Sequence, residues 1–96
     1  MDDPEIEVRD NPSARRYDVF VDGDFAGFAS YRDRGERRVF IHTKIDPDYE
    51  SEGIGTALAR GALDDVRRRA LSAVPRCPFI AAFIRRHPDY ADLVAD

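Results

Sequence analysis

The sequence contains one cysteine, one lysine and no tryptophan in 96 residues. Because Cys77 is alone, no internal disulfide can form, and we expect a cytoplasmic protein in a reducing environment. No apolar run is long enough to cross a bilayer, and the acidic start MDDPEIEV is not a signal peptide. The net charge of -4 gives no general attraction to nucleic acid or to an anionic membrane. We therefore predict neither as a partner.

What the sequence does contain is typical of one globular domain. Hydrophobic residues make up 43% of the chain and charged residues 35%, an ordinary balance for a soluble protein. A chain of this length can bury one core and has no room for a second, so residues 1–96 are predicted to form a single domain. Lys44 is the only lysine among 15 basic residues, which we interpret as genome bias before function.

The first half of the sequence predicts an antiparallel meander of four strands. Alternating apolar positions, rich in β-branched and aromatic side chains, indicate strands at residues 5–9, 16–21, 25–32 and 37–45. Turn-forming residues separate these ranges, among them Asp22-Gly23, which favours a tight hairpin. Pro47 ends the fourth strand, because proline cannot donate to a strand ladder.

The second half predicts two helices on either side of a short strand. Apolar residues at helical spacing indicate a helix over residues 56–71, where Arg67, Arg68 and Arg69 are expected to form a solvated end. Residues 72–76 predict a strand, residues 79–86 a second helix, and residues 89–94 a last helical turn. The order β-β-β-β-α-β-α is an α+β fold in which the short fifth strand lies beside the fourth.

The turn between the fourth strand and the first helix is the main functional feature, and it reads Glu52-Gly53-Ile54-Gly55-Thr56. Glycines at positions 53 and 55 permit backbone conformations that other residues avoid, and they let a ligand come close. From Thr56 onward we expect a helix whose first amides lack intrahelical partners, and such amides bind anions such as a pyrophosphate. The alternative is that the two glycines only shape the strand-to-helix turn.

The order of elements, together with IDPDY at 45–49 leading into Gly53-Ile54-Gly55, resembles the GNAT superfamily of acyl-CoA-dependent acetyltransferases. The cofactor motif of that family is Gln or Arg, two residues, Gly, one residue, then Gly or Ala, and residues 50–55 match its spacing and both glycines. The C-terminal stretch VPRCPFIAAFIRRHPDYADLV is similar to the small, minimal GNAT-like proteins that carry a cysteine after their last strand. The resemblance implies a minimal GNAT-like fold, binding of acetyl-CoA, and transfer of the acetyl group to an acceptor.

The resemblance also implies where coenzyme A would lie. Its pyrophosphate would rest on the backbone of the glycine turn, and its pantetheine arm would lie along backbone groups of the strand end, like an added strand. The implied cofactor-binding residues are Ile45, Glu52, Gly53, Ile54, Gly55 and Thr56. No metal site is predicted. Arg85 and Arg86 would either contact the cofactor's phosphates or form a solvated face.

Three features depart from the family pattern. Glu50 stands where the family has Gln or Arg, and Glu52 adds a second carboxylate beside the expected pyrophosphate. Two carboxylates there would weaken binding of coenzyme A unless they point away from the phosphates. Phe83 falls where many members place a tyrosine that acts as general acid, and Tyr90 is a candidate replacement. The chain is also shorter than a typical member, so the acceptor site would be open, or completed by a partner protein or a second copy of the chain.

Cys77 and His42 are the candidate catalytic residues. Cys77 follows the last strand, and amides at the start of the next helix would favour its thiolate, which could carry the acyl group. Equally, a lone cysteine is often a small buried hydrophobe. His42 could activate that thiol or an incoming amine, or only fill the sheet face. His87, beside Pro88, is interpreted as a helix-end residue.

Three functions therefore remain open from the sequence. The first is an acetyltransferase that acts on an unknown amine or protein acceptor, either directly or through Cys77. The second is a module that binds coenzyme A or another protein without transferring a group. The third is an interaction domain with no small ligand, in which the glycines are turn residues.

Overall fold

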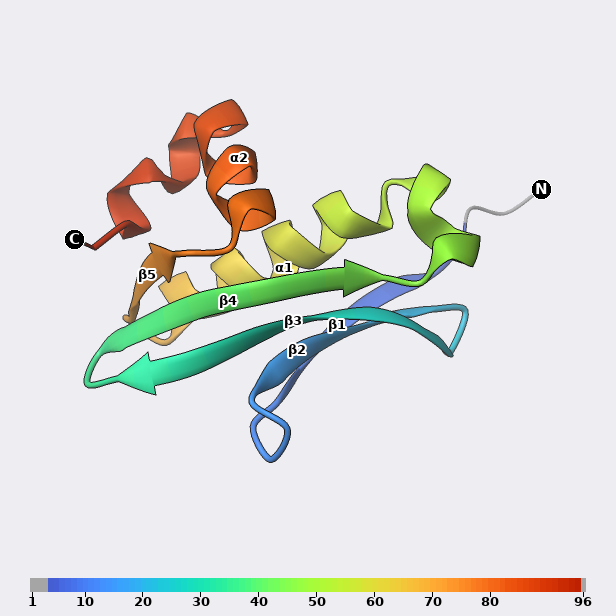
Figure 1. The fold of residues 1–96 in the computed structure, drawn as a ribbon, viewed down its shortest axis with the longest axis horizontal. Helices are drawn as coiled ribbons and strands as arrows, with labels where there is room; N and C mark the ends of the chain where they lie inside the picture. The colour runs from blue at the N-terminus through green and yellow to red at the C-terminus, as the bar shows by residue number, and fades with distance from the viewer. Residues whose placement is uncertain (1–3, 96) are drawn as a thin grey trace.

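Five strands form one sheet in the computed structural model, which describes residues 4–95 without the side chains of Ser51 and Glu52. The strands follow one another across the sheet in the order β1-β2-β3-β4-β5 (Figure 1). Strands β1 to β4 are antiparallel, and β5 is parallel to β4. This arrangement confirms the predicted α+β fold. The strand bounds are Ile6–Asn11, Arg16–Val21, Asp24–Arg34, Arg37–Ile45 and Ser72–Pro75.

Two α-helices and two short 3-10 helices complete the fold. They are η1 (Pro47–Glu52), α1 (Ile54–Arg68), α2 (Pro78–Arg86) and η2 (Pro88–Leu93). Helix α1 begins two residues before the predicted Thr56, because the left-handed backbone of Gly53 ends η1 directly before Ile54. It ends before the predicted Leu71, because Ala70 is left-handed and the Leu71 amide bonds back to the Val66 carbonyl.

The core lies between the sheet and the two α-helices, which cover the same face (Figure 1). Tyr17 and Phe40 from the sheet pack with Leu58 and Leu63 of α1, and all four are at most 1% exposed. The opposite face carries no described helix and is called the open face below. Its phenylalanines are partly covered by guanidinium groups, with Arg9 over Phe20 and Arg16 over Phe25 and Phe28.

A bulge in β4 was not predicted from the sequence. Tyr31 pairs with Phe40 and Ser30 pairs with His42, so Ile41 is left without a direct partner in β3. The extra residue changes which side chains face the helices: Arg38 and Phe40 do so before it, and Thr43 does so after it. No described helix is both long and apolar enough to cross a membrane.

Candidate functional site

The turn at Gly53 places backbone amides at the start of α1. Gly53 has φ 71°, and a Cβ at this residue would meet no atom within 4 Å, so the space beside it is open. Among the described side chains none caps α1, and its first turn contains no acidic residue. No described side chain therefore competes with an anion for the first amides of α1, those of Ile54, Gly55 and Thr56.

Gly55 contacts a side chain of α2 and does not shape the turn. It lies inside the first turn of α1, so it does not supply the unusual backbone conformation that its position beside Gly53 indicated. A Cβ on Gly55 would approach the Cζ atom of Phe79 to 2.8 Å. This close contact brings the start of α2 against the start of α1. Between them lies a groove of about 310 Å³, called the helix groove, lined by Thr56, Phe79, Ala82, Phe83, Arg86 and His87.

The C-terminal half of β4 provides a free backbone edge near the same helix start. Pairing with β5 ends at Phe40 and Pro75, after which the Cys77 amide donates to the Phe40 carbonyl and the chain turns into α2. The edge of residues 41–45 that faces away from β3 therefore has no strand beside it in the described chain. Ile45 lies at the end of this edge and packs partly against the core. An extended ligand could pair with this backbone as an added strand does.

The carboxylates near the glycine turn lie mostly in η1. Asp48 and Glu50 are in its first turn and exposed, and Asp46 caps it by accepting a hydrogen bond from the Asp48 amide at 3.0 Å. The side chain of Glu52 lies outside the part that the structure describes, so its expected position beside the pyrophosphate stays a prediction. Tyr49, beside the turn, packs partly against the core.

Cys77 is buried at the point where β4 and β5 separate. It is 3% exposed, its Sγ lies 3.3 Å from Oγ1 of Thr43, and its carbonyl accepts from the Ala81 amide in α2. Cys77 occupies the N-cap position of α2, but its side chain makes no capping hydrogen bond. The thiol is therefore held beside a hydroxyl in a small buried space under the first turn of α2.

The structure does not bring His42 to Cys77. His42 is exposed on the open face, where its ring lies edge-on to that of Phe28 at 6.2 Å between centroids. Thr43, the next residue, faces the helices and contacts the cysteine. Because neighbouring strand residues point to opposite faces, His42 can meet only a group that approaches from the open face.

The other candidate side chains of the C-terminal half have structural partners. Phe83 is buried and stacks on His87 at 4.1 Å between ring centroids. His87 ends α2, with its Nδ1 2.9 Å from the Phe83 carbonyl oxygen. The Tyr90 hydroxyl donates to Asp64 at 2.7 Å and accepts from Arg60 at 3.3 Å, which ties η2 to α1. Burial, followed by the hydrogen bond to Asp64, raises the pKa of Tyr90 above its ordinary value.

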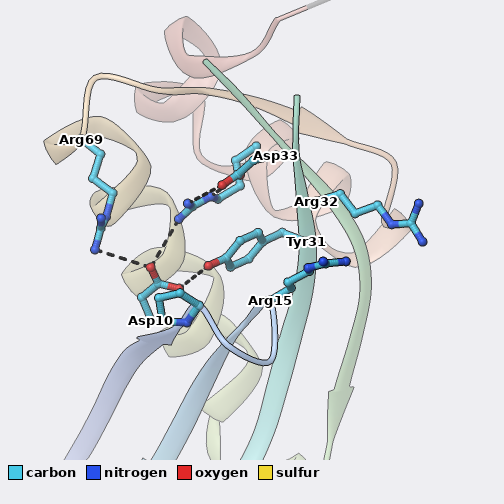
Figure 2. A pocket seen from close by; sticks show the side chains of 8 residues that line it. Asp10, Arg15, Tyr31, Arg32, Asp33 and Arg69 are labelled. Atoms are coloured by element: carbon cyan, nitrogen blue, oxygen red, sulfur yellow. Dashed lines mark hydrogen bonds and ion pairs between the residues drawn. The ribbon is translucent and has the colours of Figure 1, made fainter. Parts of the chain in front are cut away.

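A second polar region, which was not predicted from the sequence, lies near the other end of α1. Asp10 accepts a hydrogen bond from Tyr31 and lies 3.5 Å from Arg69, both drawn in Figure 2. A further buried carboxylate, Asp65, accepts from the Tyr17 hydroxyl at 2.7 Å. The hollow beside these groups measures about 610 Å³. We call Asp10, Tyr17, Tyr31, Arg38 and Asp65 the polar network.

Arg38 is the centre of the polar network. It donates through Nη1 to the Tyr17 hydroxyl at 2.7 Å and through Nε and Nη2 to both carboxylate oxygens of Asp33. Burial acts to lower the pKa of Arg38, but the hydrogen bond to Asp33 and the nearby Tyr17 outweigh it and raise that pKa. Burial, followed by the hydrogen bond to Asp65, raises the pKa of Tyr17. No described buried side-chain polar atom lacks a hydrogen-bond partner, so the buried polar groups of this network are all hydrogen-bonded.

Asp65 also explains the arginines at the end of α1. Arg68 and Arg69 donate to its carboxylate, and Arg67 forms an ion pair with Asp92 at 2.9 Å. The predicted solvated helix end is therefore a set of exposed arginines held by ion pairs. The spacing of Asp65 to Arg68 and Arg69, three and four residues, is the sequence signal for these pairs.

A family model described as GCN5-related N-acetyl-transferase matches residues 16–93. The chain belongs to this family. It is a GNAT acetyltransferase domain, as its sequence indicated.

A solved structure supports the same fold. The chain is similar to the NMR solution structure of a "GCN5-like putative N-acetyltransferase" from Staphylococcus aureus, with a TM-score of 0.70 and 15% identity. The match covers 93% of this GNAT domain and 87% of the other chain. At this identity the likeness shows the fold alone. No curated protein matches the sequence.

Proposed function

We propose that this GNAT domain binds acetyl-CoA and transfers its acetyl group to an amine. The observation that carries the proposal is the uncapped start of α1 behind the left-handed Gly53, beside the free backbone edge of β4. Acetyl-CoA supplies an acetyl group activated as a thioester. The amides of Ile54, Gly55 and Thr56 would hold its pyrophosphate, and the edge at Ile45 would hold its pantetheine arm.

The donor set fits a diphosphate, with one opposing feature. Gly53 leaves open space where a side chain would stand, and backbone amides with the helix dipole favour an anion. Arg86, in the helix groove, adds a guanidinium close to the same helix start. The exposed Asp48 and Glu50 in η1 oppose the anion, so we expect binding that is weaker than in family members with Gln or Arg at position 50.

Cys77 is the proposed acyl carrier. Its thiol would attack the acetyl-CoA thioester, form a new thioester on Cys77 and release the thiol of coenzyme A. One thioester bond breaks and one forms, so the step needs no further reagent. An amine would then attack the acetyl carbonyl, forming an amide and returning the Cys77 thiol. The position of Thr43 supports this role, because its hydroxyl lies against the sulfur and can donate to a thiolate.

His42 is the proposed proton acceptor for the incoming amine. It lies on the open face next to the bulge at Ile41, so it serves an acceptor that arrives from that side. The bulge leaves the backbone of Ile41 without a direct strand partner, and its amide is a candidate donor to the acetyl carbonyl oxygen. Direct transfer without Cys77 would use the same two groups.

Two measurements test the proposal in sequence. Calorimetric titration with acetyl-CoA should show binding to the wild-type chain; no binding would leave an interaction domain without this ligand. Intact-mass spectrometry after incubation should then show an acetyl adduct that is labile to hydroxylamine, is absent from Cys77→Ala and maps to the peptide containing Cys77. Binding without an adduct or an acetylated amine would instead favour a module that binds coenzyme A and transfers nothing, which the burial of Cys77 also fits.

A further inference from the structure

Four arginines on the open face line two adjoining hollows next to the end of the β4–β5 pairing. The hollows measure about 630 and 380 Å³ and share Arg34, Val39 and Arg76. We call them together the arginine pocket. Its residues are Arg32, Arg34, Arg37 and Arg76, with Asp33 at one side and an apolar floor of Val39, Ile41 and Val74.

Strand alternation points Arg32 and Arg34 away from the polar network, although Arg32 also borders the hollow of about 610 Å³ beside it. On β3, Tyr31 and Asp33 face Arg38, so Arg32 and Arg34 between and after them project from the other face. Figure 2 shows Arg32 pointing away from Asp10 and Tyr31. The pocket therefore takes alternate positions of β3 and β4, the strands that give Tyr31 and Arg38 to the network, and adds Val74 and Arg76 from β5 and the residue after it.

The positive charge of the pocket is not compensated within the part of the chain that the structure describes. None of the four arginines has a recorded ion pair or side-chain hydrogen bond there. Asp33, the acidic residue among the lining side chains, accepts hydrogen bonds from Arg38 with both carboxylate oxygens, at 2.8 and 2.9 Å. A chain with net charge -4 thus keeps four uncommitted guanidinium groups together, a potential that attracts an anionic ligand.

We propose that the arginine pocket binds an acidic peptide segment and presents an amine of that segment for acetylation. This inference rests on the proposed function and names its acceptor. Guanidinium groups bind carboxylates through paired hydrogen bonds, which gives both affinity and geometry. The apolar floor receives the methylene groups of Glu and Lys side chains.

The shape and composition of the pocket favour a peptide over other anions. The two hollows share Arg34, Val39 and Arg76, so together they offer a continuous surface for an extended chain. Nucleic-acid bases usually stack on aromatic side chains, and none lines this pocket. The phenylalanines on the open face, Phe20, Phe25 and Phe28, lie against Arg9 and Arg16 and outside the pocket.

The pocket also lies where an acceptor would be needed. Arg76 directly precedes Cys77, and Ile41, in the pocket floor, is the bulge residue next to His42. Pairing of β4 with β5 ends at Phe40 and Pro75, the residues directly before Ile41 and Arg76. A peptide held by the arginines would bring a lysine or an N-terminal amine to the gap between Ile41 and Arg76, on the side that His42 faces.

The test uses the full chain and direct binding without acetyl-CoA. The probes are a short peptide with one central lysine flanked by glutamates, and its counterpart with glutamines. NMR titration should show tight binding only for the glutamate peptide, with shifts at Arg34, Ile41 and Arg76. The double variant Arg34→Gln with Arg76→Gln should weaken binding about tenfold or more. Lys44→Gln, which removes a charge from the same face outside the pocket, should leave binding within about twofold.

Each outcome decides the inference. Equal binding of the two peptides, or a double variant with native shift dispersion that binds like wild type, would overturn it. So would tighter binding of oligothymidylate or inorganic phosphate at these residues. Acetyl-CoA is titrated separately: if it binds and the glutamate peptide binds but its lysine is not acetylated, the acceptor role is overturned. If acetyl-CoA fails to bind while the arginine-dependent peptide binding remains, the proposed function fails and the pocket's preference for acidic peptide stands.

Discussion

The polar network of this GNAT domain differs from the candidate binding regions, which are the start of α1 and the arginine pocket. The hydrogen-bonding groups of the network have partners within the chain, whereas the donors of the binding regions have no described side-chain partner. In the network, Arg38 bonds Tyr17 and Asp33 and lies near Asp10 and Asp65. Around the candidate site, the first amides of α1 and the four arginines of the arginine pocket have no described side-chain partner. The two regions share strands β3 and β4 and helix α1, so the difference comes from individual side chains and not from separate domains.

The comparison separates stability from binding. Satisfied buried groups cost free energy when one partner is removed, because the others stay buried without it. Unsatisfied exposed donors cost little to remove and are free to bind a ligand. Gly53 directly precedes α1 and Asp65 lies within it, about 18 Å away along the helix axis. A substitution in one region therefore does not contact the other.

The largest expected effect is on folding, at Arg38. Arg38→Met should lower the free energy of unfolding by about 3 to 5 kcal/mol, because it removes the buried cation that Asp10, Asp33 and Asp65 share. Arg69 stays near Asp10 and Asp65 but is itself half-exposed. Arg34→Met, on the open face, should change it by about 0.5 kcal/mol or less. Urea unfolding followed by circular dichroism measures both. Equal losses for the two variants would mean that the network is not the stabilising region.

The next effect is the acid dependence of stability, through Asp65. Burial acts to raise the pKa of Asp65, but hydrogen bonds from Tyr17 and Arg69 and the nearby charges of Arg69 and Arg68 outweigh it, so the pKa is lowered in the folded state. A lowered folded pKa gives stability that is present above the unfolded value of 3.8 and is lost as pH falls through the folded value.

Asp65→Asn tests this dependence. We expect the variant to lose about 1 to 3 kcal/mol near neutral pH and to show a smaller further loss below about pH 4 than wild type. Unfolding curves from neutral to acidic pH measure the difference. Asp92→Asn is the matched control, because Asp92 pairs with Arg67 on an exposed surface. Parallel acid profiles for wild type and Asp65→Asn would show that Asp65 does not contribute.

The sequence predicted the backbone of this domain better than its polar contacts. Strand ends at Arg16, Val21, Arg37 and Ile45 were predicted correctly, because alternation and turn residues act locally. The start of α1 was missed by two residues, since only the backbone angle of Gly53 fixes it. The bulge at Ile41 was missed because it depends on register between two strands, which no local pattern records.

Long-range pairs explain the other misses. Thr43 and Cys77 lie 34 residues apart, and Tyr17 and Asp65 lie 48 apart, so neither contact has a sequence signature. The alternation that predicted β4 did place His42 and Thr43 on opposite faces, which already separated His42 from the helix side. The arginines were interpreted as genome bias, and only the fold shows which are paired and which are not.

The third prediction concerns binding at Gly53. Gly53→Val should lower affinity for coenzyme A at least about tenfold, because the side chain enters the space in front of the α1 amides. It should also cost about 1 to 2 kcal/mol of stability, because a left-handed backbone disfavours a β-branched residue. Gly35→Val is the control: Gly35 also has positive φ and no atom within 4 Å of its Cβ position, but it lies in the β3–β4 turn. Calorimetry should show normal binding for that variant. Equal affinities for both would place the cofactor elsewhere.

The smallest expected effect comes from the carboxylates beside the turn, and it tests whether the open amides act by charge. Glu50→Gln should tighten binding of coenzyme A about twofold to threefold at low salt and less at high salt, because an exposed charge is screened by ions. Glu52→Arg should act in the same direction and more strongly if its side chain faces the pyrophosphate. Glu36→Gln, which makes the same change of charge in the β3–β4 turn, separates a local effect from that of net charge.

Calorimetric titrations of the three variants at two salt concentrations give the comparison. If Glu50→Gln and Glu36→Gln raise affinity equally, only net charge matters; if Glu50→Gln and Glu52→Arg leave it unchanged at both concentrations, these side chains point away from the phosphates and the departure from the family motif has no effect on the cofactor.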